Sequence, residues 1–474
     1  MPRRTATPPI LAIDLGTSSV RTALFDEKLR ALAGTSASSS YRVRHSVDHG
    51  AVLDPALLLR ATHNCLGRTR RLTKSQLPAV AGSAFWHSLL GLDRKGRPLT
   101  PIFTWADARG AEDAARLREE LDERVIQQQT GCMLRAAFWP AKLRWLRRSQ
   151  PRLFGRVARW VSPAEWIFEQ LFGLKACSHS MASGTGLYDL RRRDWNESLL
   201  EICGLTRSQL NPLADEVAVE DLTVYPSIGD GAASNLGSGA VTPGVFAINV
   251  GTSAAVRAVS TRKVKLPFGL FRYAVDRERF LIGGAVSNAG NLRAWCLREL
   301  RLPKEKQALE KLLCRSGAED ARLTILPFWV SERAPTWPEQ LDGAIHGLTQ
   351  AITAADLLHA ATSSVSHRLA DILEELGSAI GPPRRIIVSG GILQSHASLQ
   401  ILANALGCNL ELSPNQETSL RGAAVHALEM SGCKAPPPQR GKIIRYEKQK
   451  AAAARRDRKR QNQLEQLLSR DPAP

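Results

Sequence analysis

The sequence predicts an α/β protein made of two similar lobes, each with a mixed β-sheet flanked by helices. Strand-like and helix-like segments alternate along most of the chain, which is typical of this class. In addition, one motif occurs twice, as Ile13–Arg21 and as Ile248–Arg257, and both copies contain Gly-Thr-Ser. The glycines of the two copies, Gly16 and Gly251, lie close to half of the 474-residue chain apart. An internal echo at this spacing indicates two lobes rather than the three domains that the length alone suggests.

The elements of each lobe follow in order from the positions of the apolar segments. In the first lobe we expect strands at Ile10–Ile13, Val20–Phe25 and Ala79–Gly82, and helices at Ala111–Gln128, Pro140–Arg148 and Pro163–Phe172. In the second lobe we expect strands at Gly244–Ile248, Ala254–Val259, Arg279–Ile282, Leu323–Pro327, Arg385–Val388 and Asn409–Leu412, and helices at Asn288–Leu300, Ala354–Leu376, Ser398–Leu406 and Leu420–Met430. A Gly- and Ser-rich segment at 237–244 predicts the boundary. The lobes are therefore expected at 1–241 and 242–433, followed by a basic tail at 434–474 that is helical or partly disordered.

Composition and charge exclude several classes of protein. Hydrophobic residues make up 43% of the chain and glycines number 35, which excludes a disordered or collagen-like protein. Eight cysteines without a Cys-x-x-Cys pair predict free thiols in a reducing compartment. The start of the chain lacks an apolar signal core, and no apolar run reaches the length of a membrane helix. We therefore expect a cytoplasmic protein.

The net charge of +19 raises the hypothesis of a nucleic-acid partner. The tail at 434–474 carries +8 of this charge, and such Ala-, Arg- and Gln-rich ends are more often solvated helices. The expected partners are a small sugar or sugar acid and, as one option, a second copy of the chain. We expect no membrane partner and no nucleic acid as the main partner.

The Gly-Thr-Ser turns are the first candidate binding elements. Each lies between two strands, which predicts a hairpin and not the strand-to-helix turn of a Rossmann or P-loop site. Glycine allows backbone N–H groups to approach a phosphate closely, and the Thr and Ser hydroxyls add donors. A single copy would be an ordinary hairpin, whereas two copies could hold one nucleotide between the lobes. Only the first copy has a carboxylate, Asp14, which makes that residue the candidate Mg²⁺ ligand.

Three further segments carry candidate chemistry. Asp230 stands among small residues just before the boundary, where it could accept a proton from a sugar hydroxyl. A hairpin turn at Leu92–Pro98 is expected to bring together five polar and aromatic residues suited to a small polar ligand, namely Trp86, His87, Trp105, Asp107 and Arg109. Taken singly, His87 or either Trp is more often structural. The strand ending in Ser389-Gly390-Gly391 offers a smooth backbone surface for a nucleoside.

As a set and in this order, these motifs resemble the FGGY carbohydrate kinase family, part of the larger group of actin-like, sugar-kinase and Hsp70-like ATPases. The resemblance covers about residues 9–432 and includes a signature-like helix at Lys142–Leu146 and an adenosine-region segment at Glu417–Ala424. It implies two ribonuclease-H-like lobes with a nucleotide and sugar cleft between them. It further implies an ATP-dependent kinase that uses Mg²⁺ and phosphorylates a hydroxyl of a small sugar or sugar acid.

The resemblance also implies a role for each matching residue. Asp14 would organise Mg²⁺, and Asp230 would be the general base. The nucleotide would be bound by Gly16, Thr17, Ser18, Arg21, Gly251, Thr252, Ser253, Gly390, Gly391 and Gln394. The sugar would contact Trp86, His87, Trp105, Asp107 and Asp230. Two departures, Leu399 in place of an aromatic residue and Asn404 in place of an Asp, put the nucleotide contacts in question.

The acceptor sugar is left open between classes. The segments around His87 and Asp230 are more similar to gluconokinase-like members than to glycerol or xylulose kinases. An anionic sugar acid would also suit a pocket near Arg109 or Arg135. The alternatives are a pentulose kinase of the xylulose type, a catalytically idle sugar-sensing protein on the same fold, and a nucleic-acid partner that uses the tail.

Overall fold

The computed structural model describes residues 9–71, 79–219, 222–262, 264–315, 323–415 and 417–470. The chain divides into two compact units, each assembled from three separate segments. Unit 1 comprises Met1–Gly239, Phe271–Leu281 and Glu417–Pro438, and unit 2 comprises Ala240–Leu270, Ile282–Gln416 and Gln439–Pro474. None of the helices in the described ranges combines the length and the hydropathy that a membrane crossing needs.

Unit 1 is built on a six-stranded sheet with the strand order β12-β13-β6-β1-β2-β3. Its strands are β1 (Ile10–Leu15), β2 (Ser19–Phe25), β3 (Ala37–Ser40), β6 (Ala79–Ala84), β12 (Val217–Val219) and β13 (Leu222–Gly229). The strands β1, β6 and β13 are mutually parallel, whereas β1 and β2 form an antiparallel hairpin. Every residue of β1 is buried, as expected for a strand covered on both faces. The carboxyl ends of β1, β6 and β13 therefore lie at one edge of the sheet.

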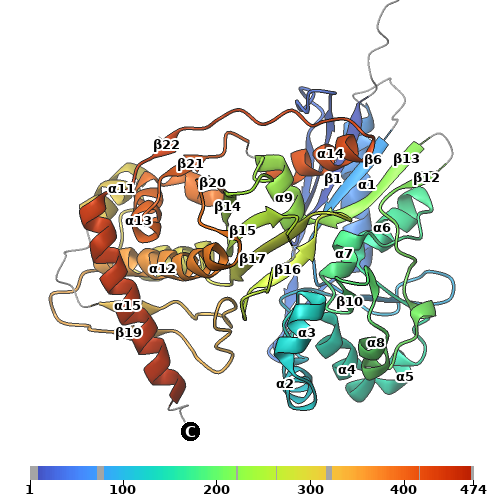
Figure 1. Cartoon of the computed structure of the whole chain (residues 1–474), viewed down its shortest axis with the longest axis horizontal. Helices are drawn as coiled ribbons and strands as arrows, with labels where there is room; N and C mark the ends of the chain where they lie inside the picture. Colours follow the sequence, from blue (N-terminus) through green and yellow to red (C-terminus); the bar gives the residue numbers. More distant parts are fainter. Residues whose placement is uncertain are drawn as a thin grey trace, which may run out of the picture. The chain divides into compact units, whose positions relative to one another are not determined.

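Two helices pack on this sheet and come from distant parts of the sequence (Figure 1). The helix α1 (Pro55–Arg71) packs on β2 and β3, and α14 (Thr418–Met430) packs on β1 and β6. The helix α14 also packs tightly on α9 (Asp230–Ser238). A Cβ atom on Gly422 would lie 1.7 Å from the carbonyl oxygen of Ala233, and one on Gly237 would lie 1.8 Å from that of Thr418. Glycine at both positions is what lets these two helices approach.

The rest of unit 1 contains the predicted helices of the first half, with one correction. The segments predicted at 140–148 and 163–172 form α4 (Trp139–Ser149) and α6 (Pro163–Phe172). The single helix predicted at 111–128 is wrong, because the chain forms α2 (Ala111–Glu120) and then α3 (Glu123–Thr130). Asp122 is the N-cap of α3, where its side chain accepts hydrogen bonds from the backbone N–H groups of Arg124 and Val125. The apolar periodicity predicts one continuous helix, but the Asp cap begins a second helix within it.

The second large sheet has seven strands in the order β16-β17-β15-β14-β20-β21-β22. Their bounds are β14 (Val245–Val250), β15 (Ala254–Ser260), β16 (Phe271–Ala274), β17 (Phe280–Val286), β20 (Arg385–Ser389), β21 (Leu410–Leu412) and β22 (Ile443–Ile444). In unit 2, β14 and β15 form an antiparallel hairpin, and β20 lies parallel to both β14 and β21. The β1–β2 and β14–β15 hairpins thus repeat one arrangement, as the sequence echo predicted.

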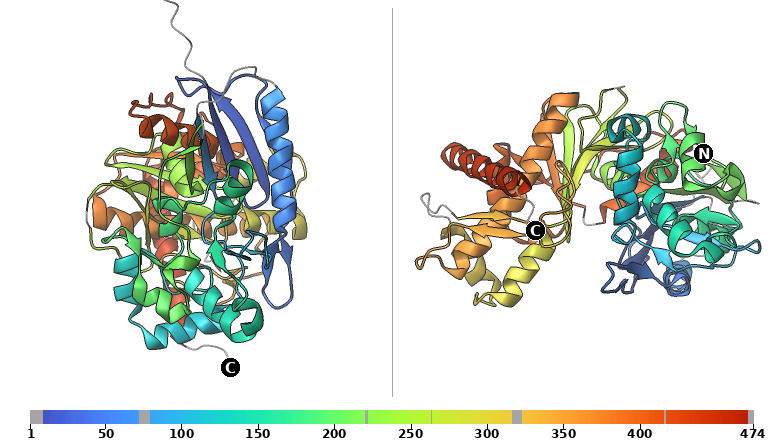
Figure 2. Two further views of the ribbon diagram at one scale, coloured as in Figure 1. Left: turned by 90° about the vertical axis from the view of Figure 1, so that its right-hand side faces the viewer. Right: turned by 90° about the horizontal axis from the view of Figure 1, so that it is seen from below.

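The helices of unit 2 are α10 (Gly290–Glu299), α11 (Lys306–Arg315), α12 (Ala354–Ile380), α13 (His396–Leu406) and α15 (Lys448–Arg470). Figure 1 shows α15 lying across α12 and α13, and α15 also packs on β18 (Thr324–Leu326). Two polar residues of α15, Gln461 and Glu465, are buried. Most of the basic segment after 434 is therefore a packed part of unit 2, and only its last four residues, 471–474, lie outside the described residues. Figure 2 gives two further views of both units.

Candidate active site

The parallel strands of unit 1 place two carboxylates at the same edge of the sheet. Asp14 of β1 pairs in register with Ser83 of β6, and Ser83 pairs with Ile228 of β13. Asp230 follows two residues after Ile228 and is the first residue of α9. Open α/β sheets bind ligands at the carboxyl ends of their parallel strands. The two acidic residues predicted as metal ligand and general base thus lie at a common edge, close enough that Asp230 raises the pKa of Asp14.

A network of charged side chains surrounds Asp14, which is only 1% exposed. The guanidinium of Arg21 donates to Asp14 Oδ2 at 2.6 Å and to Glu417 Oε2 at 2.5 Å. Burial raises the pKa of Asp14, the charge of Arg21 opposes this, and the charges of Asp230 and Glu417 add to it. Arg21 is therefore shared by two carboxylates, with a third nearby. The pairing of Glu417 with Arg21 was not predicted from the sequence, because the two residues are 396 positions apart.

The turn between β1 and β2 is tight and held from several sides. The Gly16 N–H donates to the carbonyl of Ser19 at 2.9 Å, and the hydroxyl of Tyr41 donates to the carbonyl of Gly16. Ser18 is exposed, and the carbonyl of Ser18 accepts a hydrogen bond from the N–H of Tyr41. The indole N–H of Trp105 donates to Thr17 Oγ1 at 3.1 Å. This hydrogen bond joins the predicted sugar-binding segment to the predicted phosphate turn within unit 1.

His87 is held in an unusual backbone conformation. Its φ is +65°, which is uncommon for a residue with a side chain. Its Nδ1 lies 2.5 Å from the carbonyl oxygen of Gly184, and its ring packs edge-on against Phe138 at 4.7 Å and Tyr273 at 5.4 Å. Because a carbonyl only accepts hydrogen bonds, Nδ1 carries a proton. Nε2 is therefore the ring nitrogen that could accept a hydrogen bond in the neutral tautomer.

Trp86, the neighbour of His87, is buried against Gly229, the residue that precedes Asp230. Its indole N–H donates to the carbonyl of Ser180 at 3.0 Å, and its ring lies 4.8 Å from that of Tyr273. A Cβ atom on Gly229 would fall 1.7 Å from the Trp86 ring, so only glycine fits before Asp230. Asp230 itself is half-buried, and its Oδ1 accepts from the N–H of Gly231 at 2.7 Å. Tyr273 was not predicted from the sequence.

In unit 2 the second Gly-Thr-Ser turn is braced by α10. The Gly251 N–H donates to the carbonyl of Ser253 at 2.9 Å. The carbonyls of Gly251 and Thr252 accept from the N–H groups of Gly290 and Asn291 at the start of α10. On the neighbouring strand, Gly390 has a φ of +94°, and a Cβ atom there would lie 2.4 Å from the carbonyl of Val250. Glycine at position 390, directly after β20, is therefore required by its close backbone approach to the end of β14, whereas Gly391 has ordinary contact distances.

A cavity of about 600 Å³ opens beside this turn, within unit 2. Its lining includes Gly251, Thr252, Gly391 and Gln394 from the predicted nucleotide-binding set. The sequence did not indicate the rest of its polar lining, which comes from α10, α11, α12, α13 and the segment between α10 and α11. These residues include Asn291, Arg293, Lys304, Lys306, Glu310, Thr362, Ser366 and Ser398. Its volume lies in the range of small-molecule sites. The cavity combines a phosphate-type turn with cationic side chains and an apolar wall.

Comparison with known proteins agrees with this geometry. Residues 9–237 match the N-terminal domain of the FGGY family of carbohydrate kinases, and residues 246–430 match its C-terminal domain. The chain belongs to this family. It is 27% identical to a gluconokinase of Bacillus subtilis (strain 168) over 451 residues, which is 89% of this chain and 88% of the relative. It is also 27% identical to a xylulose kinase of Escherichia coli (strain K12), with 85% of each chain covered.

The fold of this FGGY protein is that of solved sugar kinases. The crystal structure of a gluconate kinase from Lactobacillus acidophilus superposes with a TM-score of 0.91 at 24% identity, covering 98% of this chain and 99% of the other. A ligand-bound xylulose kinase from the same species has the same TM-score, identity and coverage. The protein is therefore an ATP-dependent sugar kinase of the FGGY family.

Some of the residues predicted for this FGGY kinase have other partners in the structure. Asp107 is fully buried and accepts from the guanidinium of Arg109 at 2.6 Å and from the N–H of Ala51 at 2.9 Å. The Arg109 guanidinium also lies 4.6 Å from the ring centre of Trp145. Arg135 is buried and paired with Glu123 at 3.1 Å. A substrate contact by Asp107, and a sugar-acid contact by either arginine, therefore stays a prediction.

The two departures from the family pattern lie away from the 600 Å³ cavity. Leu399 and Asn404 are both buried on α13, and neither is among the described residues that line that cavity. The Oδ1 of Asn404 accepts from the side chain of Gln400 at 3.2 Å and from the N–H of Glu447 at 2.8 Å. Asn404 thus anchors the segment that leads into α15.

Proposed function

We propose that this FGGY kinase transfers the γ-phosphoryl group of ATP to a hydroxyl of a sugar acid, with gluconate as the favoured acceptor. The observation that carries the proposal is the common edge of β1, β6 and β13, where Asp14 and Asp230 lie beside the Gly16 turn. The 600 Å³ cavity beside the Gly251 turn supports an assignment of unit 2 to the nucleotide.

In this proposal Asp230 is the general base. Asp230 is the first residue of a helix whose N-terminal turn stabilises negative charge, and it is half-buried. The preceding residue, Gly229, packs against the Trp86 ring. The Asp230 carboxylate accepts the proton of the acceptor hydroxyl as that oxygen attacks the phosphorus atom, and the bond from phosphorus to the leaving oxygen of ADP breaks. His87 orients the acceptor by accepting a hydrogen bond from a second hydroxyl at Nε2. Arg21 would contact the transferred phosphoryl group.

Asp14 and the carboxylates around it suit Mg²⁺. Mg²⁺ is commonly held by one or two carboxylates, water and substrate phosphates, so a single dedicated carboxylate is sufficient. The charges of Asp230 and Glu417 near Asp14 support this fit, because they favour a cation there in addition to Arg21. The ion would neutralise phosphate charge during transfer. Asp14 and Arg21 would hold the metal and the phosphates in place.

The preference for gluconate draws on the gluconokinases among the relatives, of which Bacillus licheniformis supplies another at 26% identity. A neutral ketopentose remains the second candidate, because the Escherichia coli xylulose kinase is as similar in sequence. We further infer a cytoplasmic location, which suits the free thiols of Cys65, Cys132, Cys177 and Cys203 and their burial.

The test is coupled ADP release with ATP and Mg²⁺, measured in parallel on gluconate, xylulose, ribulose, glycerol and fuculose. We expect the highest kcat/KM for gluconate. Good turnover of xylulose or another neutral sugar with none of gluconate would contradict the proposed acceptor and leave the kinase activity intact.

A second measurement separates an active kinase from an idle sugar-binding protein. Asp230→Asn keeps the size of the side chain and removes the base, so kcat is expected to fall roughly 10²–10⁴-fold with little change in KM for ATP. Asp93→Asn, in an exposed hairpin turn of the same unit, is the matched control and is expected to keep full activity. Equal kcat in the Asp230→Asn variant would show that the base is misassigned, and absence of turnover in the wild type on every sugar would favour the idle protein.

A further inference from the structure

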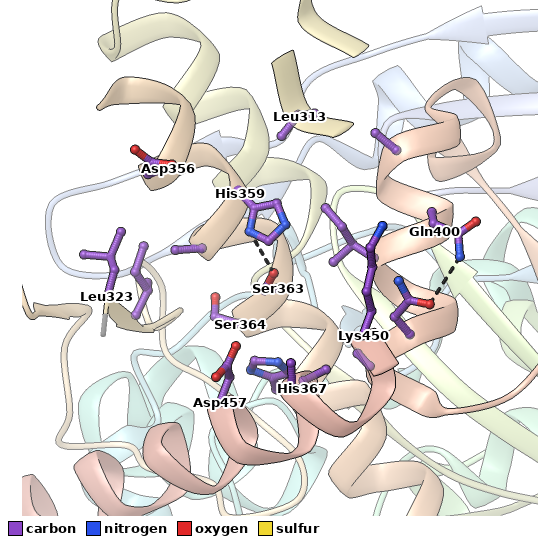
Figure 3. A pocket seen from close by; sticks show the side chains of 18 of the residues that line it. Leu313, Leu323, Asp356, His359, Ser363, Ser364, His367, Gln400, Lys450 and Asp457 are labelled. Carbon is purple, nitrogen blue, oxygen red and sulfur yellow. Dashed lines mark hydrogen bonds between the residues drawn. The ribbon is translucent and has the colours of Figure 1, made fainter. Parts of the chain in front are cut away.

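Unit 2 contains a second cavity, of about 540 Å³, between α12, α13 and α15 (Figure 3). It lies on the other side of the α12–α13 pair from the cavity assigned to the nucleotide. The helix α12 contributes Thr362 and Ser366 to the nucleotide cavity, but His359 and Ser363 to the second one. Of these two cavities, only the second is lined by residues of α15. The second cavity is therefore a separate site.

The space arises because the three helices meet through small side chains. Ala360 on α12, Ala397 on α13, and Ala453 and Ala454 on α15 all line the cavity. Larger apolar side chains at these positions would fill the junction and stabilise it, at about 25 cal/mol for each Å² of apolar surface buried. The helices instead surround an open volume with an alanine-rich wall.

The charged residues around this cavity already have partners of their own. Asp356 is held by Thr353 in the capping box of α12. Lys450 pairs with Glu447 at 3.1 Å, and Asp457 accepts from the guanidinium of Arg460 at 2.6 Å. A charged ligand would have to compete with these pairs, so the cavity favours an uncharged one.

The interior polar groups are neutral, and two of them are paired with each other, since the Ser363 hydroxyl lies 3.5 Å from His359 Nδ1. The Gln461 side-chain N–H donates to the carbonyl of Ser364 at 3.1 Å, so its Oε1 faces His367 Nδ1 at 3.0 Å as an acceptor. His367 Nδ1 is therefore protonated and Nε2 carries the lone pair. Burial lowers the pKa of His367 to about 4 and also lowers the pKa of His359, so both imidazoles are uncharged at neutral pH. Figure 3 shows both rings and Ser363 on the same stretch of α12.

We propose that this cavity binds one uncharged polyhydroxylated molecule of monosaccharide size, whose hydroxyls form hydrogen bonds with the two imidazoles and whose carbon skeleton rests on the alanines. Hydroxyl groups match neutral imidazoles and the Ser363 hydroxyl. The volume fits such a molecule, since ligand pockets run from about 300 to 1,000 Å³. The proposal concerns binding and does not depend on the catalytic assignment.

The experiment is calorimetric titration of the full-length protein with D-glucitol, in the absence of ATP. The first variant, Ala453→Leu, places three extra carbon atoms in the cavity, and the second, His359→Leu, removes one hydrogen-bonding imidazole. Ala452→Leu is the matched control, because Ala452 is the adjacent but exposed residue of α15. We expect saturable binding of one D-glucitol by the wild type and by Ala452→Leu. We expect binding at least roughly tenfold weaker in each of the other two variants, as for loss of one buried hydrogen bond.

The other outcomes would overturn the proposal. Absence of saturable binding to the wild type would show that the cavity does not take a polyol. Equal affinity in wild type, Ala453→Leu and His359→Leu would place the bound molecule elsewhere, for example at the site of Asp230. Tighter binding of D-gluconate or inorganic phosphate than of D-glucitol, with the same sensitivity to Ala453→Leu, would refute the uncharged class of ligand. Melting curves of each variant identify a loss of binding that reflects unfolding.

Discussion

Substitution of Glu465 by leucine should destabilise unit 2 more than any change on the exposed face of α15. Glu465 Oε2 accepts from Arg368 Nη1 at 2.7 Å, and its Oε1 accepts from the hydroxyl of Thr336 at 2.5 Å. Arg368 is 1% exposed, and its other contacts are the carbonyl of Ala334, the hydroxyl of Thr336 and the ring of Phe328. Glu465→Leu therefore leaves a buried guanidinium without a counter-charge.

Breaking a buried ion pair from one side costs about 3–5 kcal/mol, because the remaining charge stays desolvated. For a unit of this size each kcal/mol lowers Tm by about 2–4 °C, so the expected fall is about 6–20 °C. The assay is differential scanning calorimetry, in which the transition of unit 2 is followed. Gln463→Leu, exposed on the same helix, is the matched control and should shift Tm by less than about 2 °C.

A double variant tests the mechanism rather than only the size of the effect. Arg368→Met combined with Glu465→Leu removes both charges and keeps apolar volume, and such replacements are often neutral or stabilising. The double variant should therefore recover most of the stability lost in Glu465→Leu. The reasoning fails if Glu465→Leu melts like the wild type, or if the double variant is less stable than the single one.

Three further changes give sharp expectations. Gly390→Ala should lower Tm and raise KM for ATP, because the φ of Gly390 is +94° and an added Cβ would lie 2.4 Å from the Val250 carbonyl oxygen. Gly391→Ala is the control and should be tolerated, because a Cβ there would lie 3.8 Å from the same oxygen. Equal Tm and KM values in the two variants would contradict this prediction. His87→Ala should lower kcat/KM for the acceptor roughly 10–100-fold, because one hydrogen bond to the acceptor is lost, and it should leave KM for ATP unchanged. A change in KM for ATP alone would contradict the assignment of His87 to the acceptor. The stability of Glu165→Gln relative to the wild type should increase as pH rises from 5 to 8. Burial raises the pKa of Glu165 to about 7, so the folded wild type binds more protons than the unfolded chain between about pH 4.5 and 7 and loses stability across that window. Parallel melting curves of wild type and Glu165→Gln at pH 5 and pH 8 would show a constant difference if this were incorrect.

Local pattern was sufficient to predict the sheets and most helices. The β1–β2 and β14–β15 hairpins each combine two apolar runs with a Gly-containing turn, and such signals need no tertiary information. The same holds for the Ser162 and Pro163 start of α6, which forms a capping box with Glu165. By contrast, the break between α2 and α3 at Asp122 is a competition between helix propagation and a local cap, which periodicity alone does not resolve.

The residues that sequence reasoning missed are those brought to the site by distant segments. Glu417 reaches Arg21 through α14, and Tyr273 reaches Trp86 and His87 through the segment Phe271–Leu281 that belongs to unit 1. Neither has a local signature, since a Tyr on a strand and a Glu before a helix are common. The buried contacts of α15 were not predicted for the same reason. In sequence, a basic helix on the surface and a basic helix that packs on the protein differ only in a few polar residues, such as the buried Gln461.

The charge of the protein and the charge of its candidate site have opposite signs. The chain carries +19, yet the edge of the first sheet gathers Asp14, Glu417 and Asp230 around one guanidinium, that of Arg21. A basic surface attracts the anionic nucleotide, but at ordinary ionic strength salt screens this attraction beyond about 10 Å. The negative surplus at the edge acts at contact distance, where it would repel bare phosphate and favour phosphate that arrives with a cation. In the proposed mechanism the net charge would bear on the approach of ATP, whereas selection for its metal-bound form would rest on these few carboxylates.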